Sequence, residues 1–175
     1  MSITTQNGSA VVAMAGDHCV AIAADKRLGA QMLTVSTNFK KIFQINDYIH
    51  LGMGGLATDI DTVYETLRYE VNLLELREEH QLDPERFMHL VKSLLYEHRF
   101  GSYFISPVIA GLVPNTNEPF LATSDSIGAF TCPKDFAVAG TAEDSLYGIC
   151  ESLWKPNMNQ DELFDTISRC LIASC

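Results

Sequence analysis

The sequence of 175 residues has few basic residues and no long apolar run. It holds 12 lysines and arginines against 22 aspartates and glutamates, which gives a net charge of −10. Nucleic-acid-binding proteins carry clustered lysine and arginine, which this chain lacks. No apolar segment reaches the roughly 20 residues of a membrane helix, and the start of the chain has no signal-peptide pattern. These absences predict a cytoplasmic and nuclear protein that binds neither nucleic acid nor membrane.

The sequence also has no cysteine or histidine pattern typical of a metal site. Its five cysteines are odd in number, and no two stand at C-x-x-C spacing. This predicts free thiols in a reducing compartment rather than disulfides. The five histidines form no H-x-x-x-H pair, and the adjacent His18 and Cys19 would face opposite sides of a strand. We therefore expect no metal and no cofactor.

Strand patterns open the chain. Residues 10–16 and 19–25 are apolar runs around the turn signal Gly16-Asp17, and 40–45 and 48–55 form a second pair around Asn46-Asp47. The run 19–25 is apolar on both faces, which is typical of a strand buried between two layers. Further strands are predicted at 104–112, 119–125 and 135–140.

Helix patterns follow these strands in two pairs. Apolar residues recur every three or four positions from Ile60, with Thr58 placed as N-cap and Asp61 as the third helical residue. A second helix is predicted over 82–101, with Asp83 as N-cap and Pro84 at its first position. Two more are predicted over 142–154 and 160–175.

This order of elements predicts one α+β domain spanning residues 1–175. Two antiparallel sheets stacked face to face, with a helical pair outside each, give a four-layer αββα sandwich. The last predicted helix reaches Cys175 with its apolar stripe still running and no stop signal. We therefore expect that further sequence follows.

Several segments resemble the β-type subunits of the 20S proteasome. They are VAIAADKRLG, KKIFQI, GMGGLATDIDTV, LLYEHRFGSYFISPVIAGL and AGTAEDSLYGICESLW. The fourth, with YGICESLWKPNM, is similar to β3 (beta type-3) subunits in particular. The resemblance implies the N-terminal-nucleophile hydrolase sandwich, with the family's last C-terminal strands lacking from this sequence. It also implies partners: other β subunits in a seven-membered ring, α-ring subunits and the opposing β-ring.

The resemblance places a catalytic constellation on this chain. Active members begin with a threonine whose own α-amine serves as base, after a propeptide ending in glycine is removed. That nucleophile position falls on Ser9, the aspartate on Asp25, the lysine on Lys41 and the oxyanion glycine on Gly55. Thr141 lies at the position of a supporting serine, although we favour a helix N-cap role for it.

Ser9 is predicted to be inactive nonetheless. The sequence runs from Met1 through Gly8 into Ser9, so we expect an amide nitrogen at Ser9, which cannot accept a proton. Beta type-3 members of the family are inactive as well. The chain is therefore expected to be a non-catalytic structural subunit of the 20S core particle, which degrades proteins in ubiquitin-dependent proteolysis, with the Ser9 constellation vestigial. The alternatives are a processed peptidase with Ser9 as N-terminal nucleophile, and a monomeric binding module.

A last candidate lies in the segment ATSDSIGAF, residues 122–130. In the family this segment completes the substrate pocket of the neighbouring subunit. Asp125 stands where the segment turns, so its carboxylate would favour basic side chains in that pocket. The competing interpretation is an Asx-turn, in which Asp125 accepts backbone N–H bonds and contacts no neighbour.

Overall fold

The computed structural model describes residues 3–174 of the chain. It contains ten strands, a short 3₁₀ turn at each of Ile3–Thr5 and Arg99–Gly101, and four α-helices. The strands are β1 (Ala10–Ala15), β2 (Val20–Ala24), β3 (Leu28–Ala30), β4 (Leu33–Ser36), β5 (Ile42–Gln44), β6 (Ile49–Gly55), β7 (Ile105–Leu112), β8 (Pro119–Ser124), β9 (Phe130–Thr131) and β10 (Phe136–Gly140). The helices are α1 (Ala57–Glu78), α2 (Pro84–Glu97), α3 (Glu143–Leu153) and α4 (Gln160–Ala173).

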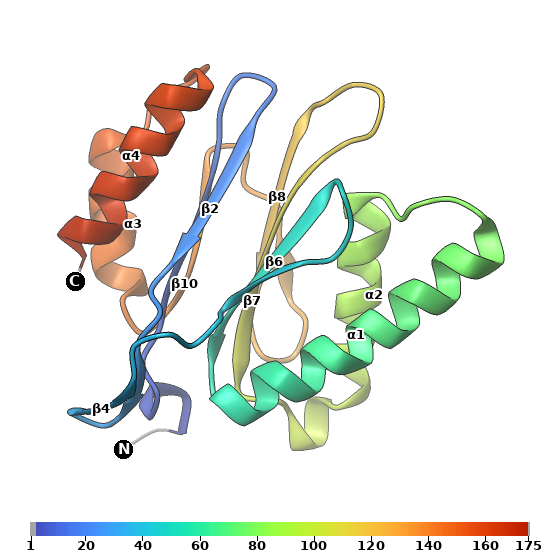
Figure 1. Ribbon diagram of the computed structural model, residues 1–175, viewed down its shortest axis with the longest axis horizontal. Coiled ribbons are helices and arrows are strands. Elements are labelled where there is room, and N and C mark those ends of the chain that lie inside the picture. The colour runs from blue at the N-terminus through green and yellow to red at the C-terminus, as the bar shows by residue number, and fades with distance from the viewer. Residues whose placement is uncertain (1–2, 175) are drawn as a thin grey trace.

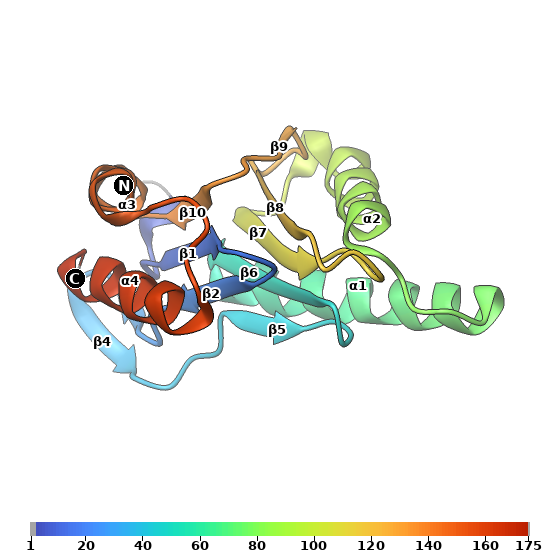
Figure 2. The ribbon, with the colours of Figure 1, turned by 90° about the horizontal axis from the view of Figure 1, so that it is seen from above.

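The strands form two main antiparallel sheets and a separate hairpin. One sheet has the order β10-β1-β2, the other the order β5-β6-β7-β8-β9, and within residues 3–174 β3 pairs only with β4. Figure 1 shows α3 and α4 outside the first sheet and α1 and α2 outside the second. Seen from above, the two sheets lie between the helical pairs (Figure 2). The predicted α+β sandwich is confirmed.

Three apolar clusters hold these layers together. The cluster between the sheets is built of small side chains, among them Val11, Ala13 and Ala137 of one sheet with Val108 and Ala110 of the other. Larger side chains such as Phe87 and Leu67 fill the space under α1 and α2, and Met14 and Leu146 help to fill that under α3 and α4. Alternating faces of β1 thus supply two different cores, as the period of a strand requires.

The helix starts confirm one predicted cap and correct another. The Asp83 side chain accepts the Arg86 N–H at 2.9 Å, with Pro84 at the first helical position as predicted. Thr58 is not the N-cap of α1, because that position is Leu56, which offers no side-chain acceptor. The Ala57 N–H is instead bound by Asn7 Oδ1 at 3.0 Å, from a residue far earlier in the chain.

Two strand predictions are refined by the structure. Strand β2 lies between two layers as predicted, since Val20, Ile22 and Ala24 join the cluster between the sheets, but it is an edge strand within the described residues and is only half-buried. Its apolar outer side chains pack against α4, as the shared cluster of Ala21 and Ala23 with Ile167 indicates. The β3–β4 hairpin and β9 were not predicted, because residues 28–36 lack a strong alternating pattern and β9 is only two residues long.

The C-terminal part of the described chain is helical to Ala173, with Ser174 as C-cap of α4. The expectation about Cys175 lies outside the described residues. Within residues 3–174, no helix is both long and apolar enough to span a membrane.

The four described cysteines are free thiols, as predicted. Cys19, Cys150 and Cys170 are buried, and burial together with the neighbouring Cys170 raises the pKa of the Cys150 thiol to about 12.

Because the thiolate is the reactive form, Cys150 should react with iodoacetamide at pH 8 more than about a hundredfold slower than the exposed Cys132. Peptide mapping after timed labelling of the native chain measures this, and equal rates would contradict the described burial.

Candidate functional site

A buried ion pair forms the base of the candidate site. Lys41 is only 3% exposed, and its Nζ lies 2.8 Å from both carboxylate oxygens of Asp25. The same ammonium donates to the carbonyl oxygens of Gly8 and Arg27 at 3.0 and 2.9 Å. Asp25 also accepts the Ala10 and Arg27 backbone N–H groups. Both charges are thus well compensated, as buried charges must be.

The segment before Ser9 is part of this structure. The Gln6 and Asn7 carbonyls accept the backbone N–H groups of Gln31 and Gly29 at 3.1 and 3.0 Å. The Asn7 side chain donates to the Gly29 carbonyl at 2.8 Å and accepts the Ala57 N–H. Residues 6–8 therefore connect the β3–β4 hairpin, Lys41 and the start of α1.

Ser9 is buried and its hydroxyl has no hydrogen-bond partner among the described residues. The residue is 5% exposed, and Oγ is the one buried side-chain polar atom of residues 3–174 found without a partner. Lys41 Nζ, whose four acceptors lie elsewhere, makes no hydrogen bond to it. Side chains at Gly54 or Gly140 would clash with Oγ, since a Cβ added to either would lie 2.7 Å from it.

The backbone of Ser9 is fixed by Thr141. The Ser9 N–H donates to Thr141 Oγ1 at 3.1 Å, and Thr141 Oγ1 donates to the Ser9 carbonyl at 3.1 Å. The predicted N-cap role of Thr141 is wrong, because the residue before α3 is Ala142. Thr141 instead lies next to the candidate nucleophile, as the family resemblance implied.

Gly55 ends β6 beside Ser9. Its φ of +129° lies in the region that favours glycine, and a Cβ there would overlap the carbonyl oxygen of Phe104. The close approach of the Phe104 backbone, just before β7, therefore explains why residue 55 is a glycine without any catalytic role. An oxyanion role for Gly55 stays a prediction.

Asp125 forms the Asx-turn that was considered as its alternative role. Its Oδ1 accepts the N–H groups of Ile127 and Ala129 at 3.0 and 2.9 Å. The side chain is on the surface, and Asp125 lines the same cavity of about 310 Å³ as Ser9, Gly55 and Thr141. The turn does not decide whether the carboxylate also acts on a neighbouring subunit, so that role stays a prediction.

Sequence reasoning missed Glu143, which lines this cavity too. It is in the first turn of α3, where an acidic residue is expected for helix stability alone. Glu143 is exposed, but partial burial of its carboxyl raises the pKa, and the nearby Asp144 raises it further. Nothing in the local sequence distinguishes this residue from an ordinary helix-start acid.

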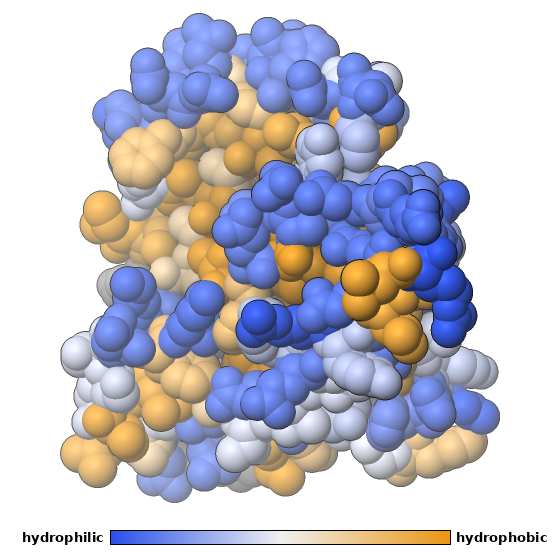
Figure 3. All heavy atoms as spheres, turned by 45° about the vertical axis from the view of Figure 1, so that its right-hand side comes forward, coloured by the Kyte–Doolittle hydropathy of each residue, from blue (hydrophilic) through white to orange (hydrophobic). Residues whose placement is uncertain are grey.

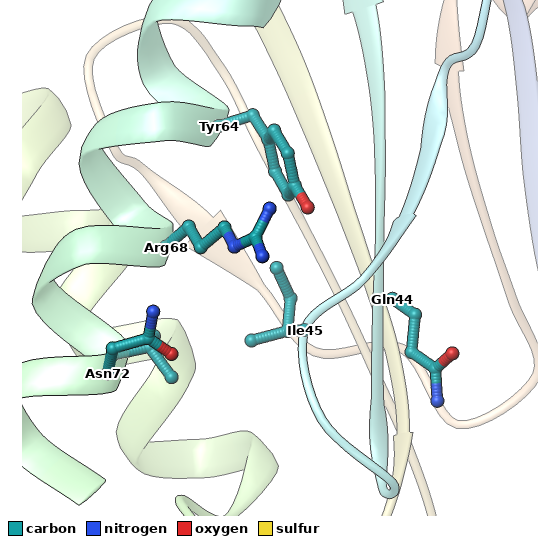
Figure 4. A pocket seen from close by; sticks show the side chains of 6 residues that line it. Gln44, Ile45, Tyr64, Arg68 and Asn72 are labelled. Carbon is teal, nitrogen blue, oxygen red and sulfur yellow. The ribbon is translucent and has the colours of Figure 1, made fainter. Parts of the chain in front are cut away.

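A separate cavity of about 220 Å³ between β5 and α1 is lined by Gln44, Ile45, Tyr64, Arg68, Val71 and Asn72. Figure 4 shows the Arg68 guanidinium directed between Tyr64 and Ile45, and no carboxylate, serine or cysteine is among these lining residues. Within residues 3–174 there is also no group of three or more His, Cys, Asp or Glu side chains that could hold a metal ion.

Comparison with known proteins shows the family to which this chain belongs. A family model described as proteasome subunit matches residues 5–175. This chain belongs to the proteasome subunit family. It is 55% identical to the proteasome subunit beta type-3 of Oryza sativa subsp. japonica over 174 residues, covering 99% of this chain and 85% of the relative. It is 53% identical to a probable proteasome subunit beta type-3 of Schizosaccharomyces pombe and 51% identical to the beta type-3 subunit of Drosophila melanogaster, covering 98% of this chain and 84% of each relative.

Proposed function

We propose that this chain is a non-catalytic β subunit of the 20S proteasome core particle, of the beta type-3 kind. The observation that carries the proposal is the environment of the Ser9 hydroxyl, which has no hydrogen-bond partner, and therefore no base, among residues 3–174. The Ser9 nitrogen donates to Thr141 Oγ1.

The contacts of the segment before Ser9 support the proposal that residues up to Gly8 stay attached to the chain. Removing residues up to Gly8 would take away the carbonyl bound by Lys41 and both hydrogen bonds of the Asn7 side chain. The Ala57 N–H at the start of α1 would then lose its acceptor. Cleavage after Gly8 would therefore lower the stability of this chain, whereas active subunits discard the corresponding segment.

Exposed apolar side chains support assembly with other core-particle subunits. On the outward face of α1, Tyr69, Leu73 and Leu76 are 68%, 44% and 80% exposed at helical spacing. At the tip of the β3–β4 hairpin, Met32 and Leu33 are 98% and 70% exposed. Figure 3 shows hydrophobic side chains reaching the surface at several places on one face of the molecule. Such surfaces are typical of subunit contacts.

The assembly itself is part of the proposal. The chain would occupy one position of a seven-membered β-ring, in contact with two β neighbours, an α-ring subunit and the opposing β-ring. The particle would act in the cytoplasm and nucleus. The relatives' names, which place them among proteasome β subunits, support the assembly.

One specific observation favours a second function, that of a processed peptidase. The resemblance assigns catalytic positions to Lys41, which binds Asp25 and the carbonyl of the residue before Ser9, and to Gly55, which lines the same cavity as Ser9. Cleavage after Gly8 would give Ser9 the free amine it lacks. The two functions differ in the intact mass of the subunit in purified particles, which shows directly whether residues before Ser9 are present.

Substituting Ser9 tests the proposal in a second way. Ser9→Ala removes a buried hydroxyl without a partner, so the free energy of unfolding should rise by about 1 kcal/mol. Peptidase activities of particles carrying the variant should equal those of the parent. Covalent epoxyketone inhibitors should leave this subunit unmodified in mass spectra.

Ser145→Ala is the matched control, since this exposed hydroxyl donates to the Ala142 carbonyl. It should change the free energy of unfolding by less than about 0.5 kcal/mol. An inhibitor adduct on Ser9, or loss of one peptidase activity in Ser9→Ala alone, would establish the processed peptidase instead.

A further inference from the structure

The cavity between β5 and α1 is lined by hydrogen-bond donors that the chain itself does not use. Its polar lining consists of the Arg68 guanidinium, the Tyr64 hydroxyl and the amides of Gln44 and Asn72. Within residues 3–174 none of these four groups makes a hydrogen bond or an ion pair. The cavity lies at the edge strand of its sheet, beside α1 (Figure 2), and shares no residue with the cavity that Ser9 lines.

Arg68 gives this cavity its positive charge. Its guanidinium is directed between Tyr64 and Ile45 (Figure 4). Tyr64 is itself fixed, because its ring stacks on Phe43 with the ring centroids 4.1 Å apart. The Lys40 ammonium lies 5.2 Å from the Phe43 ring centroid and adds a second positive charge beside this stack. No carboxylate lines the cavity, although acidic residues outnumber basic ones by 22 to 12 in the chain. The charge of the cavity is therefore suited to an anion from outside the chain.

The size and the donors of the cavity favour a carboxylate. Its volume of about 220 Å³ is below the roughly 300–1,000 Å³ of sites for drug-sized ligands and cofactors. A guanidinium can donate two parallel N–H bonds to the two oxygens of a carboxylate. Neutral amide donors come from both walls, Asn72 on α1 and Gln44 on β5 (Figure 4). The cavity thus has the donors for one carboxylate group and little room for a larger ligand.

Exposed apolar side chains of the same helix border the cavity. Leu76 follows Arg68 and Asn72 at steps of four residues, so the three side chains form one row along α1. Leu76 is 80% exposed, and Tyr69 and Leu73 beside this row are exposed as well. Arginine and tyrosine next to exposed apolar side chains are typical of protein interfaces. This surrounding favours a carboxylate that belongs to a polypeptide over a free anion.

We propose that this cavity binds the side-chain carboxylate of an aspartate or glutamate of a neighbouring subunit. Arg68 pairs with the carboxylate, and apolar side chains of the same neighbour cover Tyr69 and Leu76. Glu65, three residues before Arg68 on α1, makes no ion pair with it within residues 3–174, so the guanidinium is available. The proposal rests on the proposed function, which supplies the neighbouring subunits.

Zero-length cross-linking with a water-soluble carbodiimide tests the proposal in purified core particles. The reagent joins an amine to a carboxylate where the two groups are in contact, and Arg68→Lys supplies the amine. Arg77→Lys is the matched control, because Arg77 is an exposed arginine of the same helix that does not line the cavity. Mass spectrometry should find position 68 joined to an aspartate or glutamate of another subunit, about tenfold more often than position 77.

Arg68→Gln tests the contribution of the charge. The melting temperature of the isolated chain should stay unchanged, because the guanidinium has no partner within residues 3–174. When the variant is co-expressed with an equal amount of the parent chain, it should enter core particles about three- to tenfold less often. Arg77→Gln should enter as often as the parent. A lower melting temperature of the isolated Arg68→Gln chain would indicate a role within the chain and contradict the proposal.

The remaining outcomes separate the alternatives. Absence of a link above the Arg77→Lys control, or a link to an acid of this chain such as Glu65, would overturn the proposal. If inorganic phosphate raises the melting temperature of the parent but not of Arg68→Gln, and no link between subunits forms, the cavity binds a free anion instead. Native electrophoresis shows beforehand whether the chain is in the particle. Its absence there would contradict the proposed function, whereas its presence without a link would overturn this inference alone.

Discussion

Replacing Lys41 with methionine should lower the free energy of unfolding by about 3–5 kcal/mol, the usual cost of breaking a buried ion pair from one side. The substitution removes all four hydrogen bonds of Nζ and leaves the Asp25 carboxylate, 19% exposed, with only two backbone N–H donors. For a chain of this length, the melting temperature should fall by roughly 6–20 °C. Urea unfolding of the isolated chain followed by circular dichroism measures the effect.

Lys92→Met is the matched control for this experiment. Lys92 is exposed on α2 and makes no ion pair within the described residues, so its replacement should cost less than about 0.5 kcal/mol. The double variant Lys41→Met with Asp25→Asn removes both charges and should recover part of the loss. A single Lys41 variant as stable as the parent would show that the pair contributes nothing to the fold.

Replacing Asp125 with asparagine should lower cleavage after arginine and lysine about tenfold in assembled particles, with the other peptidase activities unchanged. We propose that the carboxylate faces the substrate pocket of a neighbouring subunit and favours basic side chains there. Asparagine keeps the oxygen that accepts the Ile127 and Ala129 N–H groups, so the turn is preserved while the charge is lost. Separate fluorogenic substrates for each activity measure the result.

Asp125→Ala is the comparison that isolates the turn, because it removes both hydrogen bonds together with the charge. If the asparagine variant keeps full activity and only the alanine variant loses it, Asp125 is a turn residue alone. Equal loss of every activity in the asparagine variant would indicate an assembly defect. Glu143→Gln should leave cleavage after basic residues unchanged, because the effect predicted here belongs to Asp125.

The sequence by itself determined the main elements and their stacking. Helical periodicity from Ile60 and the Asp83-Pro84 start predicted the two helices that pack on one sheet. The turn signals Gly16-Asp17 and Asn46-Asp47 predicted the strand pairs β1–β2 and β5–β6. These features depend on residues close together in the chain, which local conformational preferences and hydrophobic patterns can specify. Motif resemblance selected Ser9, Asp25, Lys41 and Gly55. In the structure Ser9 and Gly55 line one cavity, and Lys41 pairs with Asp25 and binds the carbonyl of the residue before Ser9.

Only the tertiary structure decided features that join distant residues. Asn7 binds the N–H at the start of α1 fifty residues later, and Thr141 fixes Ser9 across 132 residues. The residues around Asn7 and Thr141 do not indicate these hydrogen bonds. Judged from neighbouring residues alone, Thr58 was the better N-cap of α1 and Thr141 the better N-cap of α3. The half-buried edge of β2 likewise depends on which strands lie at sheet edges, and the unpartnered Ser9 hydroxyl depends on how Gly54 and Gly140 pack around it. Hydrogen bonds and burial at such places are set by the packing of whole layers, which no short stretch of sequence encodes.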